Sequence, residues 1–189
     1  MKNAYTRNRF GLKSAARQRG ASLLEGIAYL GIAALVVLGA VSLLSSAFSS
    51  SDSNRTMEEI SAIRTGVKRM FTGMANSYGN SAGGTLTNGD ITPTLISAGI
   101  FPTTLNTNAT GGTVTNTWNG AVKVTGNGQT FVIEYDAVPK AVCVSTLSGT
   151  IGWTSVSTGG TAVTSFPVSP KDADTLCAGD TNSIQLTSE

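Results

Sequence analysis

Glu25 is the residue of this sequence whose position most needs a chemical explanation. It is the only charged side chain in a run of 24 residues, from Ala21 to Leu44, that is otherwise almost wholly apolar. A charged side chain inside such a run costs on the order of 2.5–3.5 kcal/mol to place within a membrane. Two interpretations remain open: an acid tolerated near the end of the run, or an acid that awaits a positively charged partner.

Two cysteines, Cys143 and Cys177, are the other residues with chemistry of their own, and the sequence contains no histidine. Without histidine there is no His-activated nucleophile and no zinc site that needs imidazole, and two thiolates cannot make a four-thiolate site. In an exported chain an even number of cysteines predicts a disulfide. The alternative is a pair of buried free thiols.

The remaining carboxylates follow patterns that are typical of solvated side chains. Glu134 and Asp136 alternate with apolar residues along a predicted strand, so we expect them to face solvent and not to form a catalytic pair. Asp172 and Asp174 are expected in a solvated loop, and no glycine pair fits a phosphate-binding loop. The sequence therefore predicts no enzyme, no cofactor and no metal site.

Charge is distributed unevenly along the chain, whose formal net charge is +2. Residues 1–20 carry six of the 13 basic residues and no acid, which leaves seven basic against 11 acidic residues, a net charge of −4. Lys and Arg are retained on the cytoplasmic side of a membrane, so everything after residue 45 is predicted outside. Charged residues make up only 13% of the chain, which does not suggest a cytosolic enzyme or a nucleic-acid partner.

The apolar run 21–44 is long enough to span a membrane as a helix. At about 1.5 Å per residue it measures roughly 36 Å, against about 30 Å for the hydrocarbon core. It exceeds the apolar region of a secretory signal, which is about 7–15 residues long. The polar stretch 45–54 that follows is either a linker or a weakly stable part of one longer helix.

Beyond residue 54 the pattern changes twice. Apolar residues first recur at three- and four-residue steps, which indicates an amphipathic helix with one face on the core. These residues are Met57, Ile60, Ile63, Val67, Met70, Phe71 and Met74, and the charged residues Arg55, Glu58, Glu59, Arg64, Lys68 and Arg69 lie mostly off this stripe. A loop is then predicted at 76–90, short helices at 92–99 and 138–147, and strands at 113–118, 120–125, 129–136, 150–157, 161–166 and 183–188.

The junction before the apolar run resembles that of type IV prepilins. The residues RQRG at positions 17–20 precede ASLLE at positions 21–25. This matches a basic leader that ends in Gly, a small first residue, and Glu as the fifth residue after the cut. The resemblance implies that a prepilin peptidase cuts between Gly20 and Ala21 on the cytoplasmic side and methylates the new amine of Ala21.

Cleavage after Gly20 changes the electrostatics around Glu25. It removes six basic residues and creates one α-amine, whose ordinary pKa is about 7.7–8.0. In a bundle of parallel helices, the Ala21 amine of one copy can neutralise Glu25 of its neighbour. A paired buried acid costs much less than an unpaired one, so the pair favours one axial register. The family resemblance implies the same assembly role for Glu25.

Other details are similar to the type IVb branch, and especially to the PilS-like pilins of conjugative plasmids and some enterobacteria. The leader is long, the first residue after the cut is alanine, and the apolar run has no proline. The resemblance implies an α+β type IV pilin fold, with a long N-terminal helix on an antiparallel sheet and one disulfide. It divides the chain into a cleaved leader 1–20, a long helix 21–75 with its polymerisation half at 21–44, and a β-rich domain 76–189.

The predicted function is that of a major pilin precursor, anchored in the inner membrane and polymerised into an extracellular type IVb pilus for adhesion or conjugative mating contact. The expected partners are other copies of the chain, the prepilin peptidase, and an inner-membrane platform with its ATPase; the last two rest on the resemblance. One alternative is a signal-anchored envelope protein whose β-rich binding domain never polymerises. Another is a minor pilin or pseudopilin.

Overall fold

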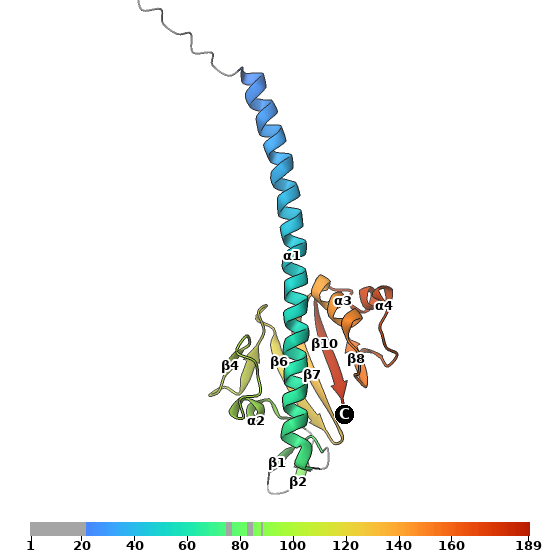
Figure 1. Cartoon of the computed structure of the whole chain (residues 1–189). Coiled ribbons are helices and arrows are strands. Elements are labelled where there is room, and N and C mark those ends of the chain that lie inside the picture. Colours follow the sequence, from blue (N-terminus) through green and yellow to red (C-terminus); the bar gives the residue numbers. More distant parts are fainter. Residues whose placement is uncertain (1–21, 75–76, 83–84, 88) are drawn as a thin grey trace, which may run out of the picture. The chain divides into compact units, whose positions relative to one another are not determined.

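The computed structural model describes residues 22–74, 77–82, 85–87 and 89–189 of the chain. The chain divides into two compact units, Met1–Leu43 and Leu44–Glu189. The second of these, called the head unit below, contains an antiparallel sheet, several short helices and the amphipathic half of the long helix (Figure 1). This arrangement, with the single disulfide described below, confirms the predicted α+β fold class.

The long helix, α1, runs from Leu23 to Phe71 and is followed by a 3-10 turn, η1, from Thr72 to Met74. The polar stretch 45–54 is therefore helical and is not a linker. Its hydroxyls donate hydrogen bonds to carbonyl oxygens four residues earlier, from Ser50 to Ser46 at 3.1 Å and from Ser53 to Ser49 at 2.7 Å. Such bonds satisfy the hydroxyls within the helix, although they stabilise it slightly less than apolar helix formers would.

The main sheet of the head unit has eight strands, in the order β4-β5-β6-β7-β10-β8-β9, with β3 paired to β6 as well. Every pairing among the described strands is antiparallel. The strands are β3 Gly89–Asp90, β4 Asn106–Asn108, β5 Thr113–Thr115, β6 Ala121–Asn127, β7 Thr130–Pro139, β8 Ser155–Thr158, β9 Thr161–Val163 and β10 Thr181–Ser188. The C-terminal strand β10 is central, because it lies between β7 and β8.

Three short helices complete the head unit: α2 Thr92–Ser97, α3 Lys140–Gly149 and α4 Pro170–Leu176. The first two confirm the helices predicted at 92–99 and 138–147. Helix α4 was not predicted, and the expectation of a loop around Asp172 and Asp174 is wrong. Ser169 caps this helix, since its hydroxyl oxygen accepts a hydrogen bond from the Asp172 backbone N–H.

The strand predictions hold best in the centre of the sheet and fail at its margins. The predicted loop at 76–90 contains β1 Asn80–Ala82 and β2 Thr85–Thr87, which form a separate two-stranded sheet, as well as β3. The strand predicted at 150–157 begins only at residue 155. Gly152, with a φ of 75°, lies in the left-handed region that favours glycine, so the chain turns there before it enters the sheet.

The core lies between the amphipathic half of α1 and the facing side of the sheet (Figure 1). The helix contributes Ile60, Ile63, Val67 and Phe71, while Met57 and Met70 are half-buried and Met74, in η1, is exposed against expectation. Strand residues on the other side include Val124, Phe131, Ile133, Ile184 and Leu186, all fully buried. A chain of tilted rings, Phe71 to Tyr78 at 5.6 Å and Tyr78 to Phe131 at 4.7 Å, joins the two sides.

The disulfide between Cys143 and Cys177 joins α3 to the residue that follows α4, with the two Cα atoms 6.0 Å apart. Both cysteines are fully buried in the core, so the predicted bridge is confirmed and the free-thiol alternative is wrong. A cross-link between residues 34 positions apart restricts the unfolded chain, which stabilises the fold by roughly 3–4 kcal/mol on the loop-entropy model. It holds the two helices beside the sheet.

Candidate assembly site on the long helix

The first half of α1 carries an exposed apolar surface. From Leu23 to Leu44, the large apolar side chains are between 55% and 84% exposed. In the part of the chain that the structure describes, this helix is long and apolar enough to cross a membrane, with a mean hydropathy of 2.5 over its most apolar window. Continuous exposed apolar surface of this kind marks a contact with lipid or with another protein.

Glu25 lies in the first turn of α1 and is exposed. A carboxylate at this position interacts favourably with the partial positive charge of the helix N-terminus. Glu25 forms no salt bridge with any described residue. Gly20 and Ala21, the predicted processing junction, lie outside the described residues, so cleavage and the role of Glu25 stay predictions.

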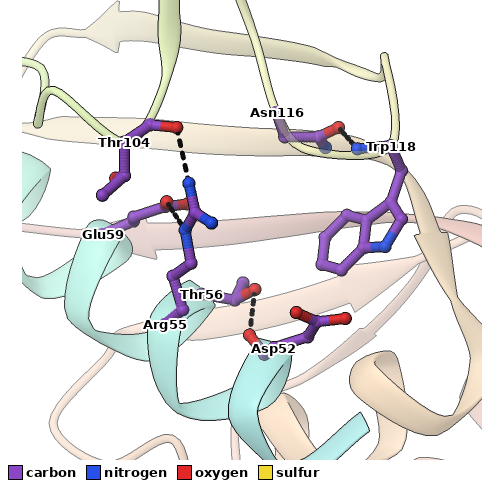
Figure 2. Close-up of polar contacts among 7 residues, drawn as sticks. All are labelled: Asp52, Arg55, Thr56, Glu59, Thr104, Asn116 and Trp118. Carbon is purple, nitrogen blue, oxygen red and sulfur yellow. Dashed lines mark hydrogen bonds and ion pairs between the residues drawn. The ribbon is translucent and has the colours of Figure 1, made fainter. Parts of the chain in front are cut away.

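A second glutamate on the same helix, Glu59, is buried in the head unit with only 5% of its surface exposed. Arg55, one turn earlier, places its Nε 3.1 Å from a Glu59 carboxylate oxygen (Figure 2). A terminal nitrogen of Arg55 donates a hydrogen bond to the carbonyl oxygen of Thr104 at 2.8 Å. One guanidinium therefore neutralises the buried acid and ties α1 to the loop that precedes β4.

Sequence analysis placed Glu59 with the charged residues off the apolar stripe, and that placement is wrong. Glu59 lies four residues before Ile63 and eight before Val67, so helical periodicity puts all three on one face. This spacing was the signal that could have identified Glu59 as a buried acid. The charge of the residue outweighed its position in the pattern.

The Tyr135 side chain reaches the same buried region from β7. Burial raises the pKa of the Tyr135 hydroxyl well above its ordinary range, and the nearby charge of Glu59 raises it further. Tyr135 therefore remains neutral at any physiological pH. A neutral hydroxyl beside a paired carboxylate keeps this part of the core free of a second charge.

Asn116 shapes the turn that lies over this part of α1. Its side-chain oxygen accepts hydrogen bonds from the backbone N–H groups of Trp118 at 3.0 Å and Gly120 at 2.8 Å, while its amide donates to the Asp136 carbonyl at 2.7 Å. A Cβ at Gly120 would lie 1.8 Å from that carbonyl oxygen, so only glycine fits. The turn carries the half-buried Trp118 toward Asp52 of α1 (Figure 2).

Arg64 connects α1 to the C-terminal end of the chain. Its guanidinium lies 4.5 Å from the centre of the Trp153 ring, and its Nε donates to the Ser188 hydroxyl at 3.0 Å. Another guanidinium nitrogen donates to the carbonyl of Gly152. Burial lowers the pKa of Arg64, but an arginine remains charged under all ordinary conditions. This cation–π contact accounts for Trp153, which the sequence placed in the core or on a sheet face.

The carboxylates set aside in the sequence lie outside this region. Glu134, on β7, is half-buried and accepts hydrogen bonds from Gln185 at 3.0 Å and Ser183 at 3.4 Å, so it is less solvated than predicted. Asp174 pairs with Lys140 at 2.9 Å on the surface. Within the described residues, no three His, Cys, Asp or Glu side chains lie close enough to hold a metal ion.

Comparisons with known proteins agree with this architecture. A family model described as PilS N terminal matches residues 50–189. The crystal structure of a type IV b pilin from Salmonella typhi is similar, with a TM-score of 0.55 and 24% sequence identity, over 69% of this chain and 95% of that chain. At this identity the likeness concerns the fold. No curated protein matches the chain.

Proposed function

Because this chain belongs to the PilS family of type IVb pilins, we propose that it is cut between Gly20 and Ala21 and then polymerises into a pilus through the apolar half of α1. The family match begins at residue 50, after that half, so processing and polymerisation rest on the residues themselves. The observation that carries the proposal is the exposed apolar helix with one acid near its start.

The apolar half of α1 has no covering partner among the described residues, so it needs an apolar environment from outside the chain. Its large side chains would lose favourable burial in water at about 25 cal/mol for each Å² left exposed. A membrane supplies that environment for the single subunit, and parallel copies of the same helix supply it in a fibre. Polymerisation thus exchanges lipid contacts for contacts between identical helices.

Glu25 sets the register of that exchange. The Ala21 amine and Glu25 are four residues apart, a rise of roughly 6 Å along a helix. Two parallel copies shifted by this amount bring the amine of one level with the carboxylate of the other. Other registers leave a carboxylate unpaired in apolar surroundings, which is strongly unfavourable. Methylation of the amine keeps its positive charge.

The subunit would be held in the inner membrane before assembly, with its N-terminus in the cytoplasm. The six basic residues of the leader support this orientation. A prepilin peptidase, an inner-membrane platform and its ATPase would process and extrude the subunit. The mature fibre would lie outside the cell as the major component of a pilus that serves adhesion or conjugative mating contact.

The experiment compares Glu25→Ala with the wild-type chain in cells that carry a prepilin peptidase. We expect the variant to be inserted in the membrane and cut after Gly20, while the yield of sheared filaments falls about tenfold or more, because each helix contact loses its ion pair. The mature N-terminus is measured by mass spectrometry, and filaments by immunoblotting and negative-stain microscopy.

The matched control is Glu134→Gln, which neutralises a carboxylate on β7, away from α1, and should leave filament yield unchanged. An intact leader on the wild-type chain, or normal filament yield from Glu25→Ala, would contradict the proposal. Wild-type cells that contain processed subunit and no filaments would favour the non-polymerising envelope protein.

A further inference from the structure

The exposed basic residues near the end of α1 lack partners in their own chain. The described residues form three salt bridges, Arg55–Glu59, Lys123–Asp90 and Lys140–Asp174. Neither Lys68 nor Arg69, both in the last turn of α1, takes part in any of these. Burial, and then the neighbouring charge of Arg64, lowers the pKa of Lys68. An additional anion near this turn would therefore be favourable.

A second stripe of side chains runs along α1 on the face opposite the buried stripe. Its members recur at three- and four-residue steps and are all exposed. At 100° per residue their mean direction lies half a turn from that of Ile60, Ile63, Val67 and Phe71. This outer stripe consists of Ser51, Asn54, Glu58, Ala62, Thr65 and Arg69.

The outer stripe repeats in character after 11 residues. Eleven residues make three helical turns and a rise of roughly 16 Å, so residues at this spacing share a face. Two parallel copies staggered by that amount place Ser51 opposite Ala62, and Asn54 opposite Thr65, on the next copy. The same stagger places Glu58 opposite Arg69. Small side chains would face small ones, and the one acid would face the one base.

We propose that the outer stripe is a head-to-tail contact between copies of this chain, in which Glu58 of one copy pairs with Arg69 of the next. The inference rests on the proposed function, since it names a second contact of the same polymer. Because the two paired residues differ, the contact does not close on itself. It repeats along one direction and so generates an open filament.

Two further features favour a second copy as the occupant. The outer stripe continues, on the same helix, from the apolar segment proposed for polymerisation. A hollow beside the stripe, lined by Thr65, Gly66, Arg69 and Ile100, leaves room for a neighbouring side chain. Gly66 keeps this side of α1 low, because a Cβ there would lie 2.4 Å from a methyl carbon of Ile100. An unrelated anionic ligand would use the basic end alone and leave Glu58 without a role.

Charge reversal tests the pairing in the full-length chain. Glu58→Arg or Arg69→Glu alone should reduce sheared filaments about tenfold, because each creates a like-charge contact between every pair of neighbours. Expressing the two variants together should restore filaments, since the mixed polymer regains opposite charges at each contact. The chain carrying both changes should also assemble. Lys171→Glu, an exposed reversal on α4, is the control and should leave yield unchanged.

Cross-linking separates this inference from the proposed function. Chains carrying Glu58→Cys and Arg69→Cys are expressed together, and a short bismaleimide is added to intact cells. We expect a dimer that contains one chain of each kind, and no such dimer when Lys171→Cys replaces Arg69→Cys.

Filaments that form without this dimer and without rescue by the mixed charge variants would overturn the pairing while leaving polymerisation intact. A dimer in membranes of cells that make no filaments would support the pairing and count against the proposed function. Reduced subunit abundance in the single variants, with no rescue in the mixture, would assign Glu58 and Arg69 to folding and overturn the inference.

Discussion

Glu25 and Glu59 lie on the same helix, yet their surroundings differ in every respect. Glu25 is exposed on an apolar segment and has no salt bridge with a described residue, whereas Glu59 is buried and held by Arg55. The apolar residues around them differ in the same way: Ile32 is 62% exposed and Ile63 is fully buried. One half of α1 is completed by its own chain, and the other half is left to be completed from outside.

The difference teaches that the two halves have separate sources of stability. The amphipathic half is part of a folded core, so its substitutions should appear in the unfolding free energy of the head unit. The apolar half contributes nothing to that core among the described contacts, so its substitutions should appear in insertion and assembly. Three predictions test this separation, beginning with the largest expected change in stability.

The matched pair Ile63→Ala and Ile32→Ala compares the two halves directly. We expect Ile63→Ala to lower the unfolding free energy of the processed chain in detergent by about 2–5 kcal/mol, because it leaves a cavity in the core. Ile32→Ala should change it by less than about 0.5 kcal/mol. Denaturant unfolding followed by tryptophan fluorescence measures both. Equal losses from the two substitutions would show that the halves are not energetically separate.

Arg55→Met removes the cation that neutralises Glu59. Breaking a fully buried pair costs about 3–5 kcal/mol, but the Arg55 side chain is 42% exposed, so solvent screening reduces the expected loss to roughly 1–2 kcal/mol. Adding Glu59→Leu should recover most of the loss, since no buried charge then remains. Glu58→Gln, one residue away and exposed, is the control for unfolding. No recovery in the double variant would mean that Arg55 acts mainly through Thr104.

Tyr135→Phe should have its effect only in alkali. The pKa of Tyr135 is raised in the folded chain, so its contribution to stability is complete below the unfolded value of about 10 and is lost as pH rises above it. Phenylalanine cannot ionise, so the variant should lose less stability than the wild type when pH is raised from about 9 to about 11. Thermal unfolding across this range measures the difference. Tyr29→Phe, in the apolar half, should follow the wild type, and identical curves for all three chains would contradict the prediction.

Local patterns account for what the sequence alone determined. The apolar run, the stripe from Met57 to Phe71 and the alternation around Phe131 each reflect a helix or strand period, so they predicted α1 and the central strands. With two cysteines in an exported chain, the pairing of Cys143 and Cys177 needed no further information. The junction at residues 17–25 carried the family resemblance, and the family match to residues 50–189 confirmed the family by an independent part of the chain.

Only the tertiary structure decided which residues meet across the chain. The burial of Glu59 depends on Arg55 and on the Thr104 carbonyl, which lies 49 positions from Arg55. The contact of Arg64 with Ser188 spans 124 positions, and the central place of β10 depends on pairing with β7 and β8. Periodicity shows which face of an element is apolar, because it depends on neighbours a few residues apart. It carries no information on which distant carbonyl or strand will satisfy a polar group, since the fold of the whole head unit makes that choice.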